Sequence, residues 1–498
     1  MTGSLPSPRT RDGAGLAILA GLVGVAGSYA LAGPSNGFVV VPVHSFIVDH
    51  TPALVLRFAI VVLGELGDYA GVVLALLSAT ALLAAVAAVA LLVGDRHGTL
   101  AALATAYGLS WVVATLLTRS PWASLGATLA MVATLGIAAR YRRRRRESAS
   151  PVSPARRLVL RTASAVLAIG AGYALGNRAP LGEPPELSTL GVEERATVER
   201  RLQTAAEKSL DVPGIPGLVS PLDAFYEVDI DAVNPGVDTD SWSLSVTGAV
   251  DRELTLSYAD LTDRDPVHEF KTLRCVGEDL NGHKLDTALW TGVPAGRLLD
   301  EAGVHPDATH VVLRAVDGYD EEFPLDAMQE GLVAYGMNGH VLPRKHGRPV
   351  RALVPGRWGE VNVKWLTDIE VIAGEHTGYW ERRNWEGTGP VTAVAKLHAV
   401  DHLGDGRVRV AGHAYAGTRG VDRVEVRVDG GAWHEATLSD PLDATDVWRM
   451  WSFTYEPPDG RHTVVVRTVD GTGTVQIRTN TAAFPSGATG WVSKRVRP

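Results

Sequence analysis

The only cysteine among the 498 residues, Cys275, is the residue whose type is best suited to chemistry. A thiolate acts as a nucleophile or as a soft metal ligand, and nearby cations favour it over the thiol. Lys271 and Arg274 lie within four positions before it. A lone cysteine excludes an internal disulfide, and its alternative role is that of an inert buried hydrophobe. We expect Cys275 to be the centre of the site, in a loop that ends in the turn dipeptide Asn281-Gly282.

A second stretch, 334–365, carries basic residues that could bind an anion. Six Lys or Arg and His346 lie between positions 344 and 364, against the single acid Glu360. Arg provides forked donors for phosphate and Lys a point charge, while the interleaved Gly and Pro indicate rigid loops. A solvated surface cluster is the alternative for a basic run alone. Together with Cys275, the pattern favours a phosphorylated cofactor.

The elements around these stretches predict a mixed α and β domain over residues 183–390. Segment 193–209 is charged and helical in pattern, 242–246 alternates as a strand, and 256–261 has a short helical signal with Ser257 as N-cap. The linker 387–390 follows.

Beyond the linker, short alternating strands recur about ten residues apart, a spacing typical of an immunoglobulin-like β-sandwich. They lie at 407–410, 421–428, 449–455, 462–468 and 475–479. We predict such a sandwich over 391–498, with Trp433, Trp448 and Trp451 as core residues.

Charge divides the chain at about residue 182. The first part carries 15 Arg, no Lys and 6 acids, a balance of +9, and the remainder carries 32 basic and 49 acidic residues, a balance of −17. Nucleic-acid binding needs a basic face, so this acidic part argues against nucleic acid as a partner.

The first 180 residues contain five stretches apolar enough to cross a bilayer. They lie at 14–33, 70–93, 99–117, 123–139 and 158–176, and a shorter one at 52–66 is interpreted as a re-entrant or interfacial helix. Six Arg in the seven positions 140–146 should be cytoplasmic. Five crossings then place the N-terminus inside, and the nearly uncharged loop 34–50 and everything after about residue 180 outside. A full crossing by 52–66 would move the N-terminus outside.

Arg156 and Arg157 precede the last apolar stretch. With the mild Ala- and Gly-rich run after them they resemble a twin-arginine export signal, and positive-inside flanking charge is the alternative. A transmembrane haem needs an axial His pair within the bilayer. His44 and His50 are expected in the outer loop and His97 on the inner side. No haem is therefore expected, and electrons must pass through a separate redox protein.

From about Leu222 onward the chain resembles the sulfite oxidase family of molybdenum enzymes, especially its prokaryotic membrane-anchored members. The motifs that carry the resemblance are 272–276 (TLRCV), 290–294 (WTGVP), 337–339 (MNG), His346-Gly347 with Pro349 and Arg351, Pro355-Gly356, Gly359, and Lys364-Trp365. Each is weak alone, and together their order and spacing are specific.

The resemblance implies that Cys275 ligates molybdenum, which is also held by the dithiolene of one molybdopterin. It further implies that His346, Arg351 and the segment from Asn362 to Lys364 hold the pterin phosphate.

The resemblance also suggests how the pocket is lined. Phe225 and Tyr226 look like the family's first cofactor-contacting strand, and Asp317-Gly318-Tyr319 is similar to a pocket-lining segment. Arg274 and Tyr319 are the candidate catalytic groups beside the cysteine.

Two positions depart from the family's pattern. Animal and plant sulfite oxidases place an Arg in the strand corresponding to 225–231, where the charged residues of this chain are Glu227, Asp229 and Asp231. Glu278 stands where many relatives carry Asn. A more acidic pocket disfavours a sulfite dianion unless Arg274, Arg314 or Arg357 compensates. Reduction of a neutral sulfoxide or N-oxide therefore stays open beside sulfite oxidation.

The preferred hypothesis is a multi-pass membrane-anchored molybdenum oxidoreductase with an extracytoplasmic active site. Its expected partners are a small-molecule substrate, a separate redox protein, membrane lipid, and a second copy paired through the C-terminal domain. The alternative is a non-catalytic surface or assembly protein with a degenerate oxidase-like domain.

Overall fold

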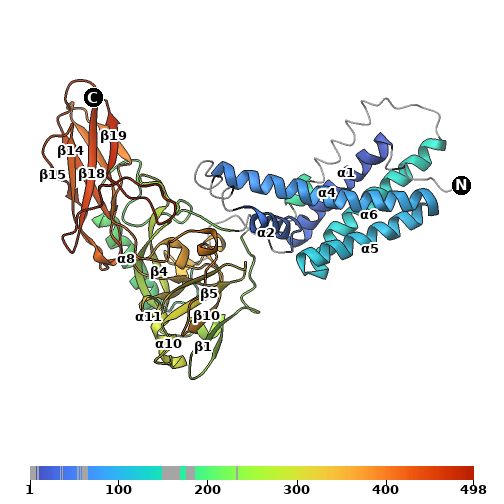
Figure 1. The fold of residues 1–498 in the computed structure, drawn as a ribbon, viewed down its shortest axis with the longest axis horizontal. Coiled ribbons are helices and arrows are strands. Elements are labelled where there is room, and N and C mark those ends of the chain that lie inside the picture. Colours follow the sequence, from blue (N-terminus) through green and yellow to red (C-terminus); the bar gives the residue numbers. More distant parts are fainter. Residues whose placement is uncertain are drawn as a thin grey trace. The chain divides into compact units, whose positions relative to one another are not determined.

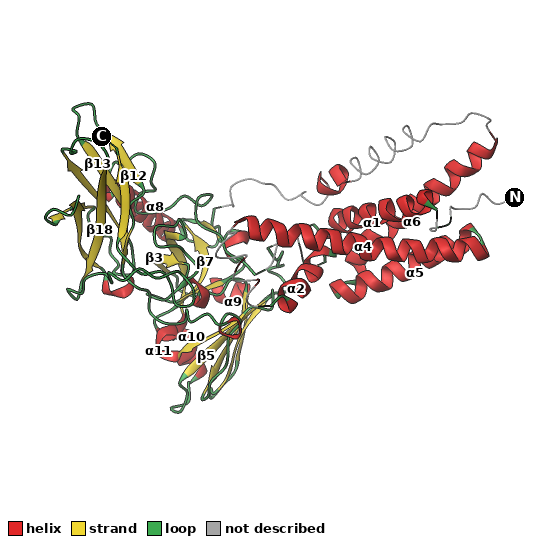
Figure 2. Cartoon of the chain, turned by 45° about the horizontal axis from the view of Figure 1, so that its top comes forward, coloured by secondary structure: helices red, strands yellow, loops and turns green. Residues whose placement is uncertain are grey.

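The computed structural model describes residues 7, 10–33, 35, 37–52, 55, 58, 65–147, 169–174, 186–230 and 234–497. Figure 1 labels its elements and Figure 2 distinguishes helix from strand. The chain divides into two compact units, a helical one over 1–183 with 229–236, and a second over 184–228 with 237–498.

The helical unit is a bundle in which α1 packs on α4 and α6, and α5 packs on the same two helices. Its helices are α1 Arg11–Ala32, α2 Val40–His50, α4 Glu65–His97, α5 Thr99–Thr118 and α6 Pro121–Glu147. Four described segments are long and apolar enough to cross a membrane: Arg11–Ala32, Tyr69–His97, Thr99–Thr118 and Pro121–Arg142. They match four of the five expected stretches.

Two expectations fall largely outside the described residues. Of the fifth stretch, 158–176, only 169–174 is described, and it is helical. Arg156, Arg157 and nearly all of 52–66 lie outside the described part of the chain.

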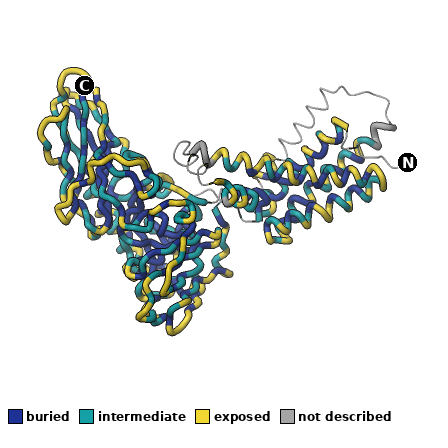
Figure 3. The backbone as a smooth tube through the Cα atoms, in the orientation of Figure 1, coloured by how far each residue is buried: buried dark blue, intermediate teal, exposed yellow. Residues whose placement is uncertain are grey.

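Small residues let the helices approach closely. A Cβ on Gly27 would lie 2.4 Å from the carbonyl oxygen of Gly126, and one on Gly126 would lie 2.3 Å from that of Gly27. Outward positions are apolar, for example Leu100, Leu116 and Trp122, which are 83%, 76% and 81% exposed. Figure 3 shows exposed residues along the outer sides of these helices. Glycine contacts inside and apolar side chains outside are the pattern of helices packed in lipid.

The loop expected at 34–50 is wrong, because Val40–His50 forms α2. Its residues are mostly apolar, and its only proline, Pro42, lies in the first turn, where a missing N–H costs no hydrogen bond. His44 is buried, and a Cβ on Gly71 of α4 would lie 3.2 Å from its Nε2. His44 therefore packs within the bundle, and its expected position toward the outer side stays a prediction.

The second unit begins with a mixed α and β domain, as expected. One sheet has the order β2-β1-β10-β5-β6, with β1 and β10 parallel and the other pairs antiparallel. Its strands are β1 Ser243–Gly248, β2 Leu254–Ser257, β5 His310–Ala315, β6 Asp320–Pro324 and β10 Leu366–Ile372. The helices of this domain are α8 Val192–Lys208, α9 Tyr258–Thr262, α10 Ala295–Ala302 and α11 Leu325–Gln329. The expected N-cap, Ser257, forms a capping box with Asp260 at the start of α9.

The other sheet of this domain positions the cysteine. Its order is β3-β4-β7-β8, with β9 also paired to β7. The strands are β3 Val267–Arg274, β4 Leu285–Pro294, β7 Leu332–Met337, β8 His340–Val341 and β9 Arg351–Leu353. β4 is buried along almost its whole length and lies between β3 and β7. Cys275 therefore leaves the end of an edge strand anchored to a rigid central one.

The C-terminal part is two antiparallel sheets that share one apolar core, including Val410, Val424, Trp451 and Val464. One sheet contains β11 Val394–Ala395, β12 Ala399–His402, β13 Val408–Tyr415, β16 Thr437–Leu438 and β17 Arg449–Tyr455. The other contains β14 Val421–Val428, β15 His434–Glu435, β18 His462–Asp470 and β19 Val492–Val496.

Two details of this part differ from expectation. The strand expected at 475–479 is wrong, because only Val475 forms a bridge, to Val469. The Gln476 side chain instead accepts from the N–H groups of Ala395 and Thr468, where a strand would use its own carbonyls. Trp448 and Trp451 are core residues, whereas Trp433 is half-buried beneath two arginines.

Candidate active site

Cys275 opens a loop that leaves β3 and returns to β4 at Leu285. Its N–H donates to the carbonyl of Lys284 at 3.0 Å, which closes the loop at its base. The N–H of Gly282 donates to the carbonyl of Asp279 at 2.9 Å, forming the expected turn. The cysteine is of intermediate exposure as a residue.

Electrostatics at this thiol differ from the expectation. Burial raises the pKa of Cys275, and Lys284 is the cation that opposes this shift. Lys271 instead pairs with Glu269 at 3.0 Å, and Arg274 with Glu278 at 3.2 Å. The expected activation of the thiol by Lys271 and Arg274 is therefore wrong. Without a metal the free residue favours the thiol form, and a soft cation would displace its proton.

An aromatic cluster connects the cysteine loop with the basic stretch. The Phe225 ring makes edge contacts with Trp290 and His346, at centroid separations of 5.7 and 5.3 Å. The backbone N–H of Tyr226 donates to Asp286 of β4 at 2.9 Å. Burial and then the charge of Cys275 raise the pKa of Tyr226. Both predicted aromatic residues therefore lie beside the site.

Phe225 and Tyr226 do not lie on a strand, however. Residues 222–225 form a turn, in which the N–H groups of Ala224 and Phe225 donate to the carbonyl of Pro221. The expected strand is not formed over the described residues 225–230, because the N–H of Phe225 donates to the carbonyl of Pro221 and that of Tyr226 to Asp286. Glu227 is exposed, as expected of a side chain that the turn directs away from the site.

The basic stretch folds around Arg351 on β9, which is 5% exposed. Its guanidinium donates to the carbonyls of His346 at 3.1 Å and Asn362 at 2.9 Å. It also stacks over Trp290, 5.2 Å from the ring centroid. The Asn362 side chain accepts from the N–H of Val354 at 2.7 Å and donates to the carbonyl of Trp358 at 3.0 Å. Asn362 shapes this loop through its side chain.

His346 and Lys364 flank Gly347 on the same loop. Burial, followed by Arg351, lowers the pKa of His346 to about 3, so the ring is neutral and offers a hydrogen bond rather than a charge. Lys364 donates to the carbonyl of Lys345 at 3.0 Å. Gly347 has φ +110°, and a Cβ there would lie 3.0 Å from Cα of Lys364 and 3.2 Å from Cβ of Arg351. Only glycine fits this cradle.

Tyr319 lies on the far side of the short helix η3, Gly359–Val361. Its hydroxyl oxygen lies 3.0 Å from a carboxyl oxygen of Glu321 and 2.9 Å from the carbonyl oxygen of Glu360, and its single proton is donated to one of them. A Cβ on Gly359 would lie 3.0 Å from the Tyr226 hydroxyl and 3.2 Å from the Arg274 carbonyl, so η3 lies against the start of the cysteine loop.

Two buried carboxyl groups near Tyr319 were not identified from the sequence. Burial, followed by Glu381, raises the pKa of Glu321 to about 11 and that of Glu360 to about 8. Both groups therefore hold protons at neutral pH. The inward position of Glu321 could have been found from the alternation in β6, where it shares a face with the buried Phe323.

Arg274 and Glu278 are buried together and face the C-terminal sandwich. Arg274 donates to the carbonyl of Thr392 at 2.8 Å and stacks on Trp358, with 4.7 Å to the ring centroid. Glu278 accepts from Arg274 and from Lys396. The expected acidification of the pocket by Glu278 is wrong, because two cations neutralise it. Arg314 pairs with Glu370 on the first sheet at 2.6 Å, and Arg357 donates to the carbonyl of Thr388 at 2.7 Å.

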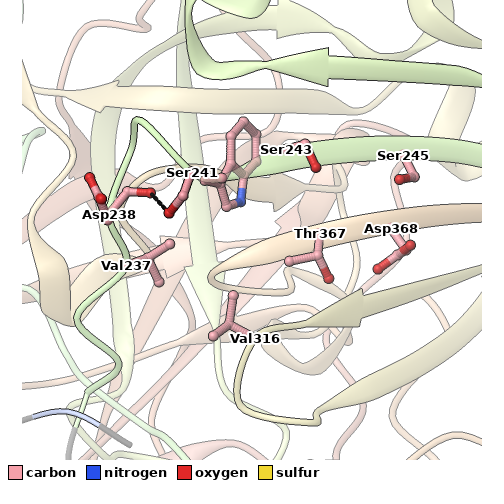
Figure 4. Close-up of a pocket in the computed structure, with 9 residues that line it drawn as sticks. Val237, Asp238, Ser241, Ser243, Ser245, Val316, Thr367 and Asp368 are labelled. Atoms are coloured by element: carbon pink, nitrogen blue, oxygen red, sulfur yellow. Dashed lines mark hydrogen bonds between the residues drawn. The ribbon is translucent and has the colours of Figure 1, made fainter. Parts of the chain in front are cut away.

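Two cavities lie among the described residues at places other than Cys275. The larger, about 390 Å³, lies over β1 and β10 and is polar (Figure 4); Trp242 and Asp368 are in its wall. The smaller, about 110 Å³, lies behind the cysteine loop, between His283 and Asp286 on one side and Lys396 and His398 on the other.

The described residues fit a phosphorylated cofactor with a soft metal. The thiol of Cys275 supplies the soft donor, a glycine cradle leaves room for close backbone approach, and Arg351 and Lys364 supply positive charge beside it. The aromatic wall of Phe225 and Trp290 adds an apolar side.

Comparison with known proteins identifies the family. A model of the oxidoreductase molybdopterin binding domain matches residues 231–380, and one of the Mo-co oxidoreductase dimerisation domain matches 389–486. Sulfite oxidase of Arabidopsis thaliana is 30% identical over 275 residues, which cover 44% of this chain and 70% of that protein. An uncharacterized oxidoreductase of Bacillus subtilis is 32% identical over 154 residues, 30% of this chain and 76% of that one. The chain belongs to the sulfite oxidase family of molybdopterin-dependent oxidoreductases.

Other relatives show the extent of the likeness. Mitochondrial sulfite oxidase of Rattus norvegicus is 31% identical over 298 residues, 49% of this chain. This chain spans about half the length of that relative, 54%. The solved structure of the sulfane dehydrogenase SoxCD from Paracoccus pantotrophus shares the fold, with a TM-score of 0.50 at 18% identity over 65% of this chain and 94% of that one.

Membership of the sulfite oxidase family accounts for both halves of the second unit. The molybdopterin domain contains Cys275 and the basic loop, and the dimerisation domain is the two-sheet part that follows. The cofactor is molybdopterin with molybdenum, as the sequence motifs predicted. The individual roles of Cys275, Arg274, Tyr319 and the basic-loop residues stay predictions, now with defined positions.

Proposed function

We propose that this protein is a membrane-anchored molybdenum oxidoreductase that transfers an oxygen atom to or from a small substrate outside the cytoplasm. The observation that carries the proposal is the convergence of two distant segments, the cysteine loop and the basic loop, on the aromatic residues Phe225 and Tyr226. A degenerate domain has no reason to keep the lone cysteine and a buried cationic cradle together.

We assign a separate role to each group at the site. Molybdenum bound to its pterin supplies two-electron oxygen-atom transfer. Cys275 provides the protein's sulfur ligand, Arg351 and Lys364 stabilise the pterin phosphate, and neutral His346 offers a hydrogen bond. Tyr319 keeps its proton because burial and then Glu321 raise its pKa, and its hydroxyl joins Glu321 to the backbone of η3.

The substrate class follows from charge. The substrate is small, and sulfite and neutral sulfoxides or N-oxides are the candidates. Since Arg274 and Lys396 neutralise Glu278, that residue no longer disfavours a sulfite dianion. Neutralisation of Glu278 therefore removes one of the arguments against sulfite as the substrate.

Location is proposed from the helices and the charges. Four described helices can span a bilayer, and the Arg-rich segment 140–146 at the end of α6 favours the cytoplasmic side. One further crossing, at the expected stretch 158–176, places the molybdenum domain outside, as in a prokaryotic membrane-anchored member of the family. Protease added to spheroplasts should then digest the C-terminal domains and spare a tag at the N-terminus.

We also propose that the C-terminal module has an immunoglobulin-like topology and pairs two subunits. Its two antiparallel sheets with a common core and its match to a dimerisation domain support this. Electrons are exchanged with a separate protein. Sedimentation of the detergent-solubilised chain should give a dimer.

Metal analysis of the full chain tests the catalytic proposal. Protein from molybdate-fed cells should contain about one molybdenum per chain, the ratio set by a single thiolate ligand. It should react with sulfite, methionine sulfoxide or an N-oxide in the presence of an artificial electron carrier, and Cys275→Ala should lose both metal and activity. A metal-free wild-type protein would favour a non-catalytic surface or assembly role instead.

A further inference from the structure

We propose that Lys396 of the C-terminal domain is a positioning residue for the cysteine loop, which it holds through Glu278. The C-terminal domain would then help to position the active-site cysteine, in addition to any role in subunit pairing. The inference rests on the proposed function, since it concerns how Cys275 is presented to the molybdenum.

The first contact between the cysteine loop and the C-terminal domain is a buried cluster of three charged side chains, Arg274, Glu278 and Lys396. Glu278 accepts from Nε of Arg274 at 3.2 Å and from Nζ of Lys396, and the side chains of all three are at most 1% exposed. Lys396 also donates to the carbonyl of Gly282 at 3.0 Å. A buried ion pair contributes little net stability, because desolvation offsets the attraction, but it specifies one geometry. Here that geometry joins two points of the cysteine loop to one amine of another domain.

The carboxylate of Glu278 also fixes the loop from inside. It accepts from the backbone N–H of Lys284, the residue whose carbonyl receives the N–H of Cys275. A Cβ on Gly282 would lie 2.8 Å from Cγ of Glu278, so the loop is tightly packed around this side chain. A shift of Glu278 therefore shifts the base of the loop and the cysteine with it.

A second set of contacts joins the same loop to the same domain without charge. The Asn281 side chain donates to the carbonyl of Leu397 at 3.0 Å and accepts from its N–H at 2.8 Å. His398 lies 3.1 Å from the carbonyl of Gly282. The segment 396–398 therefore runs beside the tip of the loop and is hydrogen-bonded to it.

The strand that leads into the cysteine is held by this domain as well. Thr272 on the outer edge of β3 donates its N–H to the carbonyl of Asp446 at 3.0 Å, and its hydroxyl accepts from the N–H of Trp448 at 2.9 Å. The hydroxyl of Tyr415 donates to Asp446 at 2.6 Å. The C-terminal domain therefore contacts the strand before Cys275 and the loop after it.

The lone cysteine gives a direct probe of this arrangement. In metal-free full-length protein, iodoacetamide can alkylate only Cys275, and its rate reports how often the loop opens. We expect Lys396→Met to raise this rate about tenfold, the factor that corresponds to ~1.4 kcal/mol of local stability. Arg407→Met is the matched control, because Arg407 lies in the same domain and pairs with the exposed Asp405. Its rate should equal that of the wild type.

The loaded enzyme provides a second readout. Lys396→Met should retain molybdenum, lower kcat with KM unchanged, and alter the electron paramagnetic resonance signal of the reduced metal, which depends on the geometry of the thiolate ligand. If Lys396→Met does not accumulate, Asn281→Ala removes the uncharged contacts of the same loop and should also accelerate alkylation. Unchanged alkylation and an unchanged signal in both variants would overturn the inference. Absence of molybdenum from the wild type would instead overturn the proposed function.

Discussion

The two loops that form the site are stabilised in opposite ways. The basic loop, 343–364, is held by its own side chains: Arg351 bonds two of its carbonyls, Asn362 bonds two further backbone groups, and Lys364 bonds a third carbonyl. The cysteine loop, 275–284, is held largely from the C-terminal domain, through Lys396 and Leu397.

This difference in support predicts how far the effect of a substitution in each loop should extend. The phosphate-binding half is held mainly by its own side chains around Arg351, although the carbonyl of Gly356 accepts from the N–H of Val391 in the C-terminal domain. Damage around Arg351 should therefore stay largely within the molybdopterin domain. The metal-binding half depends on the docking of two domains, so changes at their boundary should reach the metal. The following substitutions test that contrast, beginning with the largest expected effect.

Removing the centre of the basic loop should have the largest effect. Arg351→Ala leaves the buried carbonyls of His346 and Asn362 without donors, which should lower the free energy of unfolding by about 3 kcal/mol and abolish molybdopterin binding. Thermal unfolding and metal content measure the two effects. Arg351→Lys, which keeps the charge but not the fork, should recover only part of both. Wild-type metal content in Arg351→Ala would contradict the role we assign to this loop.

A matched pair of asparagines separates internal from external support. Asn362→Ala and Asn281→Ala each remove two hydrogen bonds to backbone, a loss of roughly 1–3 kcal/mol. Hydrogen exchange should locate each effect: faster exchange at the Val354 amide for the first, and at the Leu397 amide for the second. The contrast between the loops fails if both substitutions perturb the same amides.

The two loops should also respond differently to pH. Burial raises the pKa of Glu360, in the basic loop, from 4.5 to about 8. The folded state therefore binds this proton more tightly than the unfolded state. The associated stability is fully present below pH 4.5 and is lost as the pH rises toward 8, by at most about 1.4 kcal/mol per pH unit. Glu278 in the cysteine loop is ion-paired instead.

The measurement is the apparent unfolding midpoint of wild type and Glu360→Gln across this pH range. The variant keeps the shape of the side chain and has no proton to lose, so its midpoint should fall less as the pH rises. Parallel pH profiles would show that Glu360 does not titrate between the two states.

The smallest effect is expected away from both loops. Arg314 pairs with Glu370 at 2.6 Å on the surface of the first sheet, with side chains 41% and 34% exposed. Exposed pairs contribute little, so Arg314→Ala should change stability by less than about 0.5 kcal/mol and leave activity unchanged. A large loss of activity would instead support the prediction from the sequence that Arg314 compensates acidic charge in the substrate pocket.

Much of the architecture could be predicted because it depends on local patterns. Apolar runs of sufficient length identified four helices that the structure contains, and strict alternation identified β14 at 421–428 and β17 at 449–455. The strands expected at 225–231 and 475–479 were wrong over the residues that the structure describes. A tight turn and Asp286 in the first, and the Gln476 side chain in the second, satisfy backbone groups that a strand would otherwise pair. Residue type alone does not show which partner a backbone group finds.

By itself the sequence determined the division into apolar and acidic parts, the lone cysteine, and the basic loop with its glycines, because these are properties of composition and spacing. The tertiary structure alone decided the electrostatics of the site. It gave Glu278 a partner 118 residues away in Lys396, directed Arg274 toward the sandwich, and placed Glu321 and Glu360 as buried acids beside Tyr319. Such pairings form when distant segments are buried against each other, and burial rather than proximity in the chain sets the charge state of each group.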